Sequence, residues 1–498
     1  MNKYITKALL FSVLAAPVLT SCELDQYPAT SLPSEQSWQT MSDATNHGNG
    51  LLAAIRGVAN GNAGIQEAQA DLFNQRTNST SYTQVHTWQF TTAQFDGDGL
   101  WSGNYSLVTN ANDIINNIDK IQTSTKDDSL TIRRIKGTAY FARAYAMSTM
   151  AQRYCQNYDP TTAATTLGLP IVKTVDPQAK PSRSSLADTY AQILEDIDSA
   201  KTHLNDPGNL DYSEPGYNVA EALEARVYLN MKSYDKAIAT VDDLLTRYHV
   251  YPATQSKDGL TNLWTSDYAE QGTELIYEPI YTQGERSSLY GMYISYDDTK
   301  AVYTPNYIPT LGLYKMYARG DRRQTLFFKR VQMQAGSVKV TGQLFNKFPG
   351  NAELLTENDN PNTTFINMPK PFRTAELYLI AAEASYMKDG SGASYLNTLR
   401  QSRGLSATTN NGENLWQDIK DEWVREFCGE GFRLNCLKRW HEGFKRMEAQ
   451  NLAAGFLSTY LDCQNLTVDA DNYRFLWEIP ANDLQANKNL QRNWPVSE

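Results

Sequence analysis

Two stretches of the sequence place aromatic rings among polar side chains, and the first surrounds Trp88. Asp71, Asn74 and Arg76 lie upstream of it in a segment rich in amides and hydroxyls. An indole ring can stack on the C–H face of a sugar, while carboxylate, amide and guanidinium groups bond the hydroxyls around its edge. The combination predicts a glycan-binding loop, and burial in the core is the alternative role for Trp88.

The second stretch is rich in tyrosine. Tyr290, Tyr293 and Tyr296 follow one another at intervals of three, with Asp297 and Asp298 directly after them. Because binding residues are often found on loops that a rigid scaffold positions, we expect these rings to complete the sugar platform. Packing in the core or against a partner protein is the alternative for each individual tyrosine.

No motif for catalysis accompanies these loops. The five histidines are scattered, without an HExxH pattern or a pair four residues apart, which argues against a zinc site. The chain also lacks a nucleophile elbow, a phosphate-binding glycine loop and a dinucleotide fingerprint. We therefore expect a protein that is not an enzyme, with no catalytic residues, no metal and no cofactor.

A glycoside hydrolase is one alternative, because two carboxylates distant in sequence can flank a sugar in space. The best-marked acids are Glu376, Glu383, Glu426 and Glu430, and they lie in segments expected to be helical. This position favours a structural role for them. A scaffold that binds protein or peptide, without any sugar site, is the other alternative.

The N-terminal segment predicts export and anchoring. Two lysines precede an apolar run over residues 8–19, which has the length of a signal-peptide core. The run ends in Leu19-Thr20-Ser21-Cys22, which resembles a bacterial lipobox. We therefore expect residues 1–21 to be removed, Cys22 to be lipidated, and residues 22–37 to form a tether to the membrane.

Composition sets further limits on the 498-residue chain. A formal charge of −10 and a pI near 5.2 argue against nucleic acid as a partner, since nucleic acid requires a basic surface. Cys155, Cys428, Cys436 and Cys463 show no CxxC or zinc-ligand spacing. They are expected mainly as buried small hydrophobic residues, although an exported protein could pair them.

The elements that must position these loops are helices. Residues 217–245 predict two short helices joined by a turn at residues 230–233. The small side chains of Ala225 and Ala237 let antiparallel helices approach closely, while Tyr228 fills the space beside their crossing. This is the tetratricopeptide pattern. Since one such pair cannot bury its own apolar face, further pairs must stack on it.

Other segments supply those partners. Helices are expected over residues 101–121, 133–154, 186–204, 373–387, 395–403, 418–427 and 432–450, and a short hairpin over residues 327–348. Residues 46–64 and 71–95 are expected mainly as loops. The fold class is therefore mostly α, with an N-terminal part over 38–250 and a C-terminal part over 251–498.

The order of several motifs resembles the SusD/RagB family of lipid-anchored glycan-binding proteins. The motifs are Trp101-x-x-x-Tyr105, Phe141-Ala142-Arg143-Ala144-Tyr145, Asp321-Arg322-Arg323, Glu430-Gly431-Phe432-Arg433 and Trp477-Glu478-Ile479-Pro480. The resemblance implies a scaffold of tetratricopeptide-like helix pairs with irregular binding loops. It also implies an oligosaccharide ligand, a position on the outer membrane at the cell surface, and a partner, a TonB-dependent transporter of the SusC type. The sugar and its linkage are left open, and a peptide cargo is a further alternative.

Overall fold

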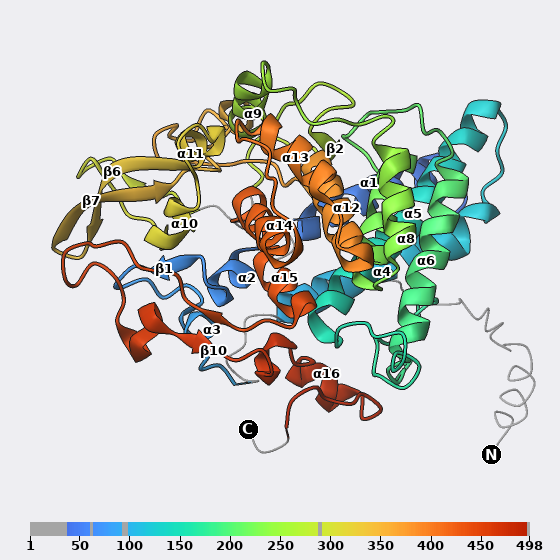
Figure 1. The fold of residues 1–498 in the computed structure, drawn as a ribbon. Coiled ribbons are helices and arrows are strands. Elements are labelled where there is room, and N and C mark those ends of the chain that lie inside the picture. Colours follow the sequence, from blue (N-terminus) through green and yellow to red (C-terminus); the bar gives the residue numbers. More distant parts are fainter. Residues whose placement is uncertain (1–36, 60–62, 92–97, 287–290, 496–498) are drawn as a thin grey trace, which may run out of the picture.

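The computed structural model describes residues 37–59, 63–91, 98–286 and 291–495, and it is mostly helical. Cys22 and the expected signal peptide lie outside these residues. Helices stack along one side of the molecule, and a small sheet containing β6 and β7 lies at the opposite end (Figure 1). Within the described ranges, no helix is long and apolar enough to cross a membrane.

The helix pair expected over residues 217–245 is confirmed. α7 (Tyr217–Asn230) and α8 (Tyr234–Leu244) are joined by a short turn, and Ala225 and Ala237 are fully buried where the helices cross. Glu224 of α7 is buried as well, and its carboxylate accepts a hydrogen bond of 2.6 Å from Lys201. The buried acid is accommodated because Lys201 of a neighbouring helix supplies its counter-charge.

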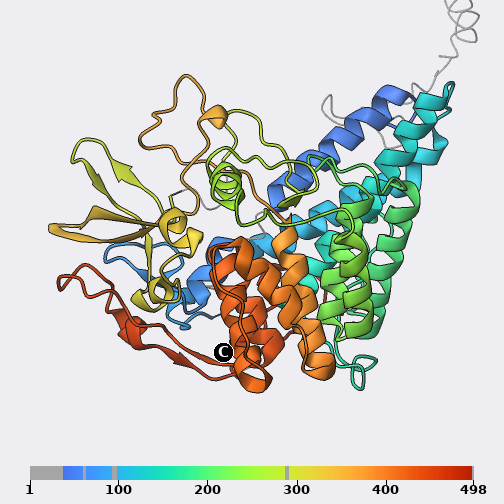
Figure 2. The same ribbon diagram turned by 45° about the horizontal axis from the view of Figure 1, so that its top comes forward.

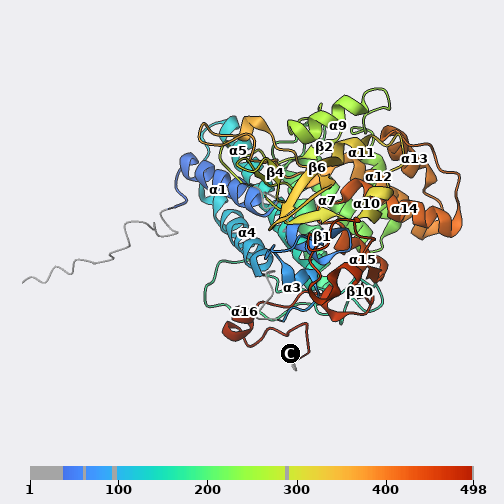
Figure 3. The same ribbon diagram turned by 90° about the vertical axis from the view of Figure 1, so that its left-hand side faces the viewer.

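The N-terminal stack extends this pair. It contains α1 (Met41–Ala59), α4 (Asp98–Asn117), α5 (Lys126–Tyr154) and α6 (Leu186–His203). α5 packs against both α4 and α6, and α1 lies beside α4 (Figure 3). Inside the stack, Arg143 of α5 forms an ion pair of 2.6 Å with Asp196 of α6. The stacked pairs bury together the apolar faces that each pair alone would leave exposed.

A second group of helices lies between this stack and the sheet (Figure 2). It contains α12 (Thr374–Asp389), α13 (Ala393–Ser402), α14 (Gly412–Phe427) and α15 (Arg433–Trp440). α12 packs against α8 as well as against α13 and α14, so it joins the two groups. Almost all of α12 is buried for this reason.

Two expectations about helices are wrong. Residues 46–64 are not mainly loop, because α1 runs through most of them. A glycine suits position 48 of this helix because a side chain there would press against Ile135 of α5. The helix expected over residues 432–450 ends at Trp440. His441 adopts a left-handed backbone with φ +54°, and the following residues form a strand instead.

The remaining elements are short and form the loop-rich side of the molecule. The short helices are α2 (Ala63–Gln69), α3 (Thr83–His86), α9 (Ser256–Thr265), α10 (Leu311–Lys315), α11 (Arg322–Phe327) and α16 (Ala481–Ala486). The strands are β1 (Phe73–Gln75), β2 (Leu275–Tyr277), β3 (Tyr296–Asp297), β4 (Val302–Tyr303), β5 (Tyr307–Pro309), β6 (Phe328–Ala335), β7 (Val338–Phe345), β8 (Phe372–Arg373), β9 (Phe444–Lys445) and β10 (Thr467–Val468).

The strands pair mostly over long sequence distances. β6 and β7 form the expected antiparallel hairpin, in a sheet of order β3-β4-β6-β7. β1 pairs with β5, β2 with β8, and β10 with β9. Segments far apart along the chain are therefore tied together on the side where the expected binding loops lie.

Two large hydrophobic cores support these elements, and a third, small cluster contains Tyr281, Leu354 and Ile366. The larger of the two cores draws side chains from both expected parts of the chain, including Leu107 and Leu379. The other core lies under the sheet and includes Phe73 and Phe345. The four described cysteines are buried as free thiols, which confirms their expected role as small core residues. The division at residue 250 stays a prediction.

Candidate functional site

Trp88 does not offer a face to a ligand in the structure. It follows α3 in a left-handed conformation and is only 3% exposed. Its Nε1–H donates a hydrogen bond of 2.7 Å to the carbonyl of Gln69. Phe475 and Phe444 meet the indole edge-on, with ring centroids 4.8 and 5.7 Å away. Trp88 is thus part of the core, the alternative role, and burial corrects the expectation that it forms an open platform.

The polar residues expected beside Trp88 also make internal contacts. Asp71 is buried and accepts two hydrogen bonds of 2.8 Å from the guanidinium of Arg433. Asn74 is buried on β1. Arg76 is half-buried, and its Nε–H donates to the carbonyl of Pro305 at 2.7 Å. Asp71 and Arg76 thus hold separate segments of the chain together, and the structure does not bring any of the three side chains to an open surface around Trp88.

The tyrosine-rich stretch is divided between the core and the surface. Tyr290 lies outside the described residues. Tyr293 is buried, and its ring centroid is 5.0 Å from that of Phe345, so it cannot serve as an open platform. Tyr296 is half-buried on β3 and packs edge-on against Tyr303 of β4 at 4.8 Å. Among the expected rings that the structure describes, Tyr296 alone retains accessible surface.

A different tyrosine is more open to solvent. Tyr268 follows α9, is 51% exposed and lines a cavity of about 540 Å³. Polar side chains share the lining with this ring: Asn262, Ser266, Gln283, Asn351 and Glu353. An accessible ring beside amide, hydroxyl and carboxylate groups is the composition expected of a sugar site. We refer to this cavity as the Tyr268 groove.

The floor of the Tyr268 groove is held by a buried charge cluster. Asp267 accepts hydrogen bonds from Lys370 at 2.6 Å and from Asn351 at 3.1 Å. Lys370 also lies 2.8 Å from the carboxylate of Glu278. Burial raises the pKa of Glu278 to about 8, although the charge of Lys370 opposes that rise. These contacts fix the backbone that carries Tyr268.

The charge of the groove restricts its ligands. Glu353 is exposed at its edge, whereas none of the described residues that line it is basic. The nearby Lys370 is already occupied by two carboxylates. An acidic sugar would therefore meet a carboxylate without a compensating cation, which favours neutral ligands.

Sequence reasoning missed Tyr268, although the signal used for Trp88 was present. The ring stands in Thr265-Ser266-Asp267-Tyr268, a polar stretch within the least helical part of the chain. A single tyrosine attracts less notice than a cluster of them. Asp267, directly before it, adopts a left-handed backbone with φ +48°, and no residue type encodes that conformation uniquely.

Comparison with known proteins identifies the family. A family model described as starch-binding and associating with the outer membrane matches residues 24–229, and the model of the SusD family matches residues 322–495. The chain belongs to the SusD family. The two matches cover most of the chain and include the motifs on which the resemblance was based, except Asp321, which lies one residue before the second match. Among proteins with curated descriptions, none matches this chain.

Solved structures share the fold of this SusD-family protein. A SusD superfamily protein from Bacteroides thetaiotaomicron has 24% identity and a TM-score of 0.73, covering 92% of this chain and 100% of that one. A SusD-like carbohydrate binding protein from Bacteroides vulgatus has 18% identity and a TM-score of 0.72, covering 92% and 98%. A laminarin binding SusD-like protein has 17% identity and a TM-score of 0.70, covering 92% and 99%. At these identities the likeness establishes the fold.

The best-marked acids of this SusD-family protein are occupied by internal ion pairs. Glu376 pairs with Arg226 at 2.6 Å, and Glu383 with Arg439 at 2.7 Å. Glu430 pairs with Arg373 at 2.7 Å. All three carboxylates are buried or nearly so, which supports the structural role expected for them.

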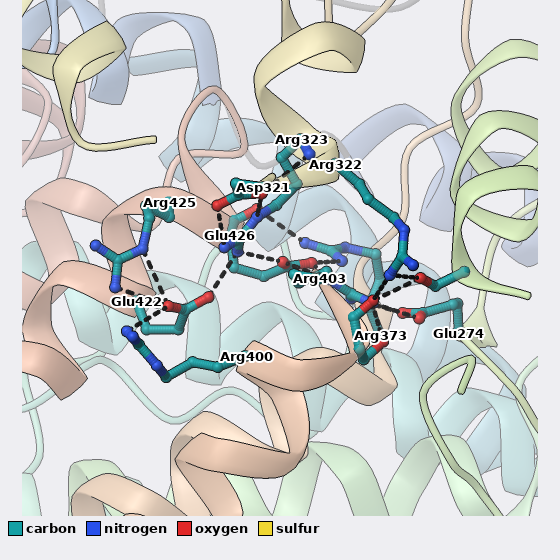
Figure 4. Close-up of polar contacts among 12 residues, drawn as sticks. Glu274, Asp321, Arg322, Arg323, Arg373, Arg400, Arg403, Glu422, Arg425 and Glu426 are labelled. Carbon is teal, nitrogen blue, oxygen red and sulfur yellow. Dashed lines mark hydrogen bonds and ion pairs between the residues drawn. The ribbon is translucent and has the colours of Figure 1, made fainter. Parts of the chain in front are cut away.

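Glu426 lies at the centre of the largest such network (Figure 4). Its carboxylate accepts hydrogen bonds from Arg323, Arg373 and Arg403 at 2.7–3.0 Å. These guanidinium groups hold the pKa of Glu426 well below its usual range, against the effect of burial. A carboxylate that stays ionised and is surrounded by protein is unsuited to the role of general acid.

Proposed function

We propose that this protein is a non-catalytic glycan-binding lipoprotein of the outer-membrane surface. Lipid on Cys22 would hold it there, and it would pass oligosaccharides to a SusC-like TonB-dependent transporter. Membership of the SusD family supports the proposal, as do structural relatives whose names describe carbohydrate binding, laminarin binding among them. A surface glycoside hydrolase and a peptide-binding subunit are the alternatives that the experiments below address.

The Tyr268 groove is the observation that carries the proposal for this chain. Its ring provides an accessible apolar face, and Asn262, Gln283 and Glu353 offer hydrogen-bond partners around it. Because no basic side chain among the described residues lines the groove, we propose neutral oligosaccharides as its ligands. Tyr296 and Tyr303 would add a second, smaller contact surface on the sheet.

Mutation of Tyr268 tests the site. Replacing it with alanine removes the ring and should weaken binding of a neutral glucan such as laminarin by about 1–2 kcal/mol, or roughly 5–30-fold. Tyr460→Ala is the matched control, because Tyr460 is also 51% exposed but does not line the groove. Calorimetric titration of a soluble form starting at residue 23 measures both variants.

Two further results would change the proposal. New products in the titrated mixtures, seen by chromatography, would favour the hydrolase. Equal affinities for the Tyr268→Ala and Tyr460→Ala variants would remove the groove as the glycan site.

The charge of the ligand gives a further prediction. A polygalacturonate should bind more weakly than laminarin, because its carboxylates would lie near Glu353 without a cation to pair with them.

The delivery step needs a separate experiment. Isolation of the full-length protein from outer membranes should recover a TonB-dependent transporter with it, and Tyr268→Ala should leave that association unchanged. Loss of the lipid through Cys22→Ala should release the protein from the membrane. Transporter association without binding of any glycan would favour the peptide-binding or scaffold alternative.

A further inference from the structure

Two buried cations lie where α15 meets the C-terminal end of α5. Arg153 is in the last turn of α5 and is 1% exposed, and Lys438 is in α15 and is 9% exposed. Within the described part of the chain, neither has a carboxylate within 4.0 Å. Arg323, Arg373 and Arg403, by contrast, all have acidic partners. Arg183 and Arg446 are also buried without an ion pair among the described residues, but each donates to several carbonyl groups.

Neutral groups satisfy these cations only in part. The ammonium of Lys438 donates to the carbonyls of Gln152, at 2.7 Å, and Cys155, and so caps the end of α5. Arg153 donates through Nη2 to the side-chain oxygen of Asn435. Among the described residues, its Nε and Nη1 atoms are buried and have no hydrogen-bond acceptor. Arg153 is therefore the less satisfied of the two.

Such an arrangement is costly without a counter-ion. A buried charge that lacks an ionic partner loses its hydration with little in return. Burial lowers the pKa of Arg153 to about 9. Burial also lowers the pKa of Lys438 well below its usual range, and the charge of Arg153 lowers it further. An anion between them would offset both effects.

A small cavity is present at this position. Arg153, Lys438, Arg439 and Lys232 line it, together with amide and tyrosine side chains, and its volume is about 20 Å³. None of the described residues that line it is acidic. Arg439 is already paired with Glu383, and Lys232 is exposed to solvent, so the uncompensated buried charge comes from Arg153 and Lys438. A volume of this size holds about one water-sized particle and excludes organic ligands.

We propose that the cavity between α5 and α15 is a binding site for a small inorganic anion of halide size. The anion would lie against Arg153 and Lys438 and neutralise charge that the protein itself leaves unpaired. The site would stabilise the contact between the N-terminal stack and the α12–α15 group. It is separate from the Tyr268 groove, since no residue lines both cavities.

Diffraction from bromide-soaked crystals tests the site on the unmodified protein. Bromide scatters anomalously, so a peak in the anomalous difference map next to Arg153 and Lys438 is the expected result. Bromide peaks elsewhere on the molecule with none in this cavity would overturn the proposal, because the soak would have worked. A water molecule in the cavity, with no anomalous signal, would overturn it as well.

Thermal unfolding gives an independent readout. Chloride should raise Tm relative to gluconate at the same ionic strength, since gluconate is too large for the cavity. When the chloride concentration is a hundred times its dissociation constant, Tm should rise by about 3 °C. Lys438→Met should abolish this difference, while Lys315→Met should retain it because Lys315 is exposed and paired with Glu448. Equal Tm values for the original protein in chloride and gluconate would refute anion binding.

Discussion

Replacing Glu426 by glutamine tests the buried network most directly, because it removes a charge and changes little of the shape. The carboxylate accepts four hydrogen bonds from three guanidinium groups, and all of its surroundings are protein. In the variant, an amide nitrogen would point its own hydrogens at guanidinium donors. Arg323, Arg373 and Arg403 would also lose their shared negative partner.

The expected loss follows from the burial of these groups. Breaking a buried ion pair from one side costs about 3–5 kcal/mol, because the remaining charge stays desolvated. The entropy of unfolding of a chain this long is roughly 1 kcal mol⁻¹ K⁻¹, so Tm should fall by about 3–5 °C. The pKa of Glu426 is held well below its usual range, so the carboxylate stabilises the fold above its unfolded pKa. That advantage should shrink as the pH falls below about 4.5.

Thermal unfolding monitored by circular dichroism measures the effect, and Glu448→Gln is the control. Glu448 forms an ion pair with Lys315 at 2.6 Å, but both side chains are more than half exposed. Screening by water makes such a pair weak, so Tm should stay within about 1 °C. Similar Tm losses for Glu426→Gln and Glu448→Gln would refute the argument that burial sets the strength of this network.

Two further variants test other features of the fold. Glu67 is buried, and desolvation raises its pKa to about 7, so the original protein should lose stability as the pH rises from 4.5 through 7. Glu67→Gln should therefore gain about 3 °C in Tm relative to the original protein over that interval, and a constant difference would contradict this assignment. Gly392 has φ +111°, and a side-chain carbon there would lie 2.4 Å from the carbonyl oxygen of Ala382. Gly392→Ala should lower Tm more than Gly390→Ala, because Gly390 has no atom within 4 Å of that position; equal losses would show that the contact relaxes.

Local patterns in the sequence were sufficient where the contacts are local. The spacing of Ala225 and Ala237 predicted the α7–α8 pair because helix periodicity decides which residues meet. The alternation in residues 327–348 predicted the β6–β7 hairpin for a similar reason. The order of motifs along the chain was sufficient for the family. None of these conclusions required knowledge of distant partners.

The binding residues depended on contacts that local patterns do not show. Trp88 has polar neighbours in sequence, but it is buried by Phe444 and Phe475, which come from the other end of the chain. Tyr268 has similar neighbours and remains exposed. Residue type and nearby sequence are alike in the two cases, so exposure is decided by whether a remote segment packs over the ring.

The same distinction applies to charge. Lysine and arginine are common on protein surfaces, and nothing next to Arg153 or Lys438 in sequence marks them as buried. The tertiary structure brings them together and places acidic partners elsewhere. The sequence by itself thus determined the family, the helix pairs and the hairpin, which arise from short-range periodicity. Only the tertiary structure decided which rings are accessible and which charges lack a partner, because burial depends on every segment that packs around a residue.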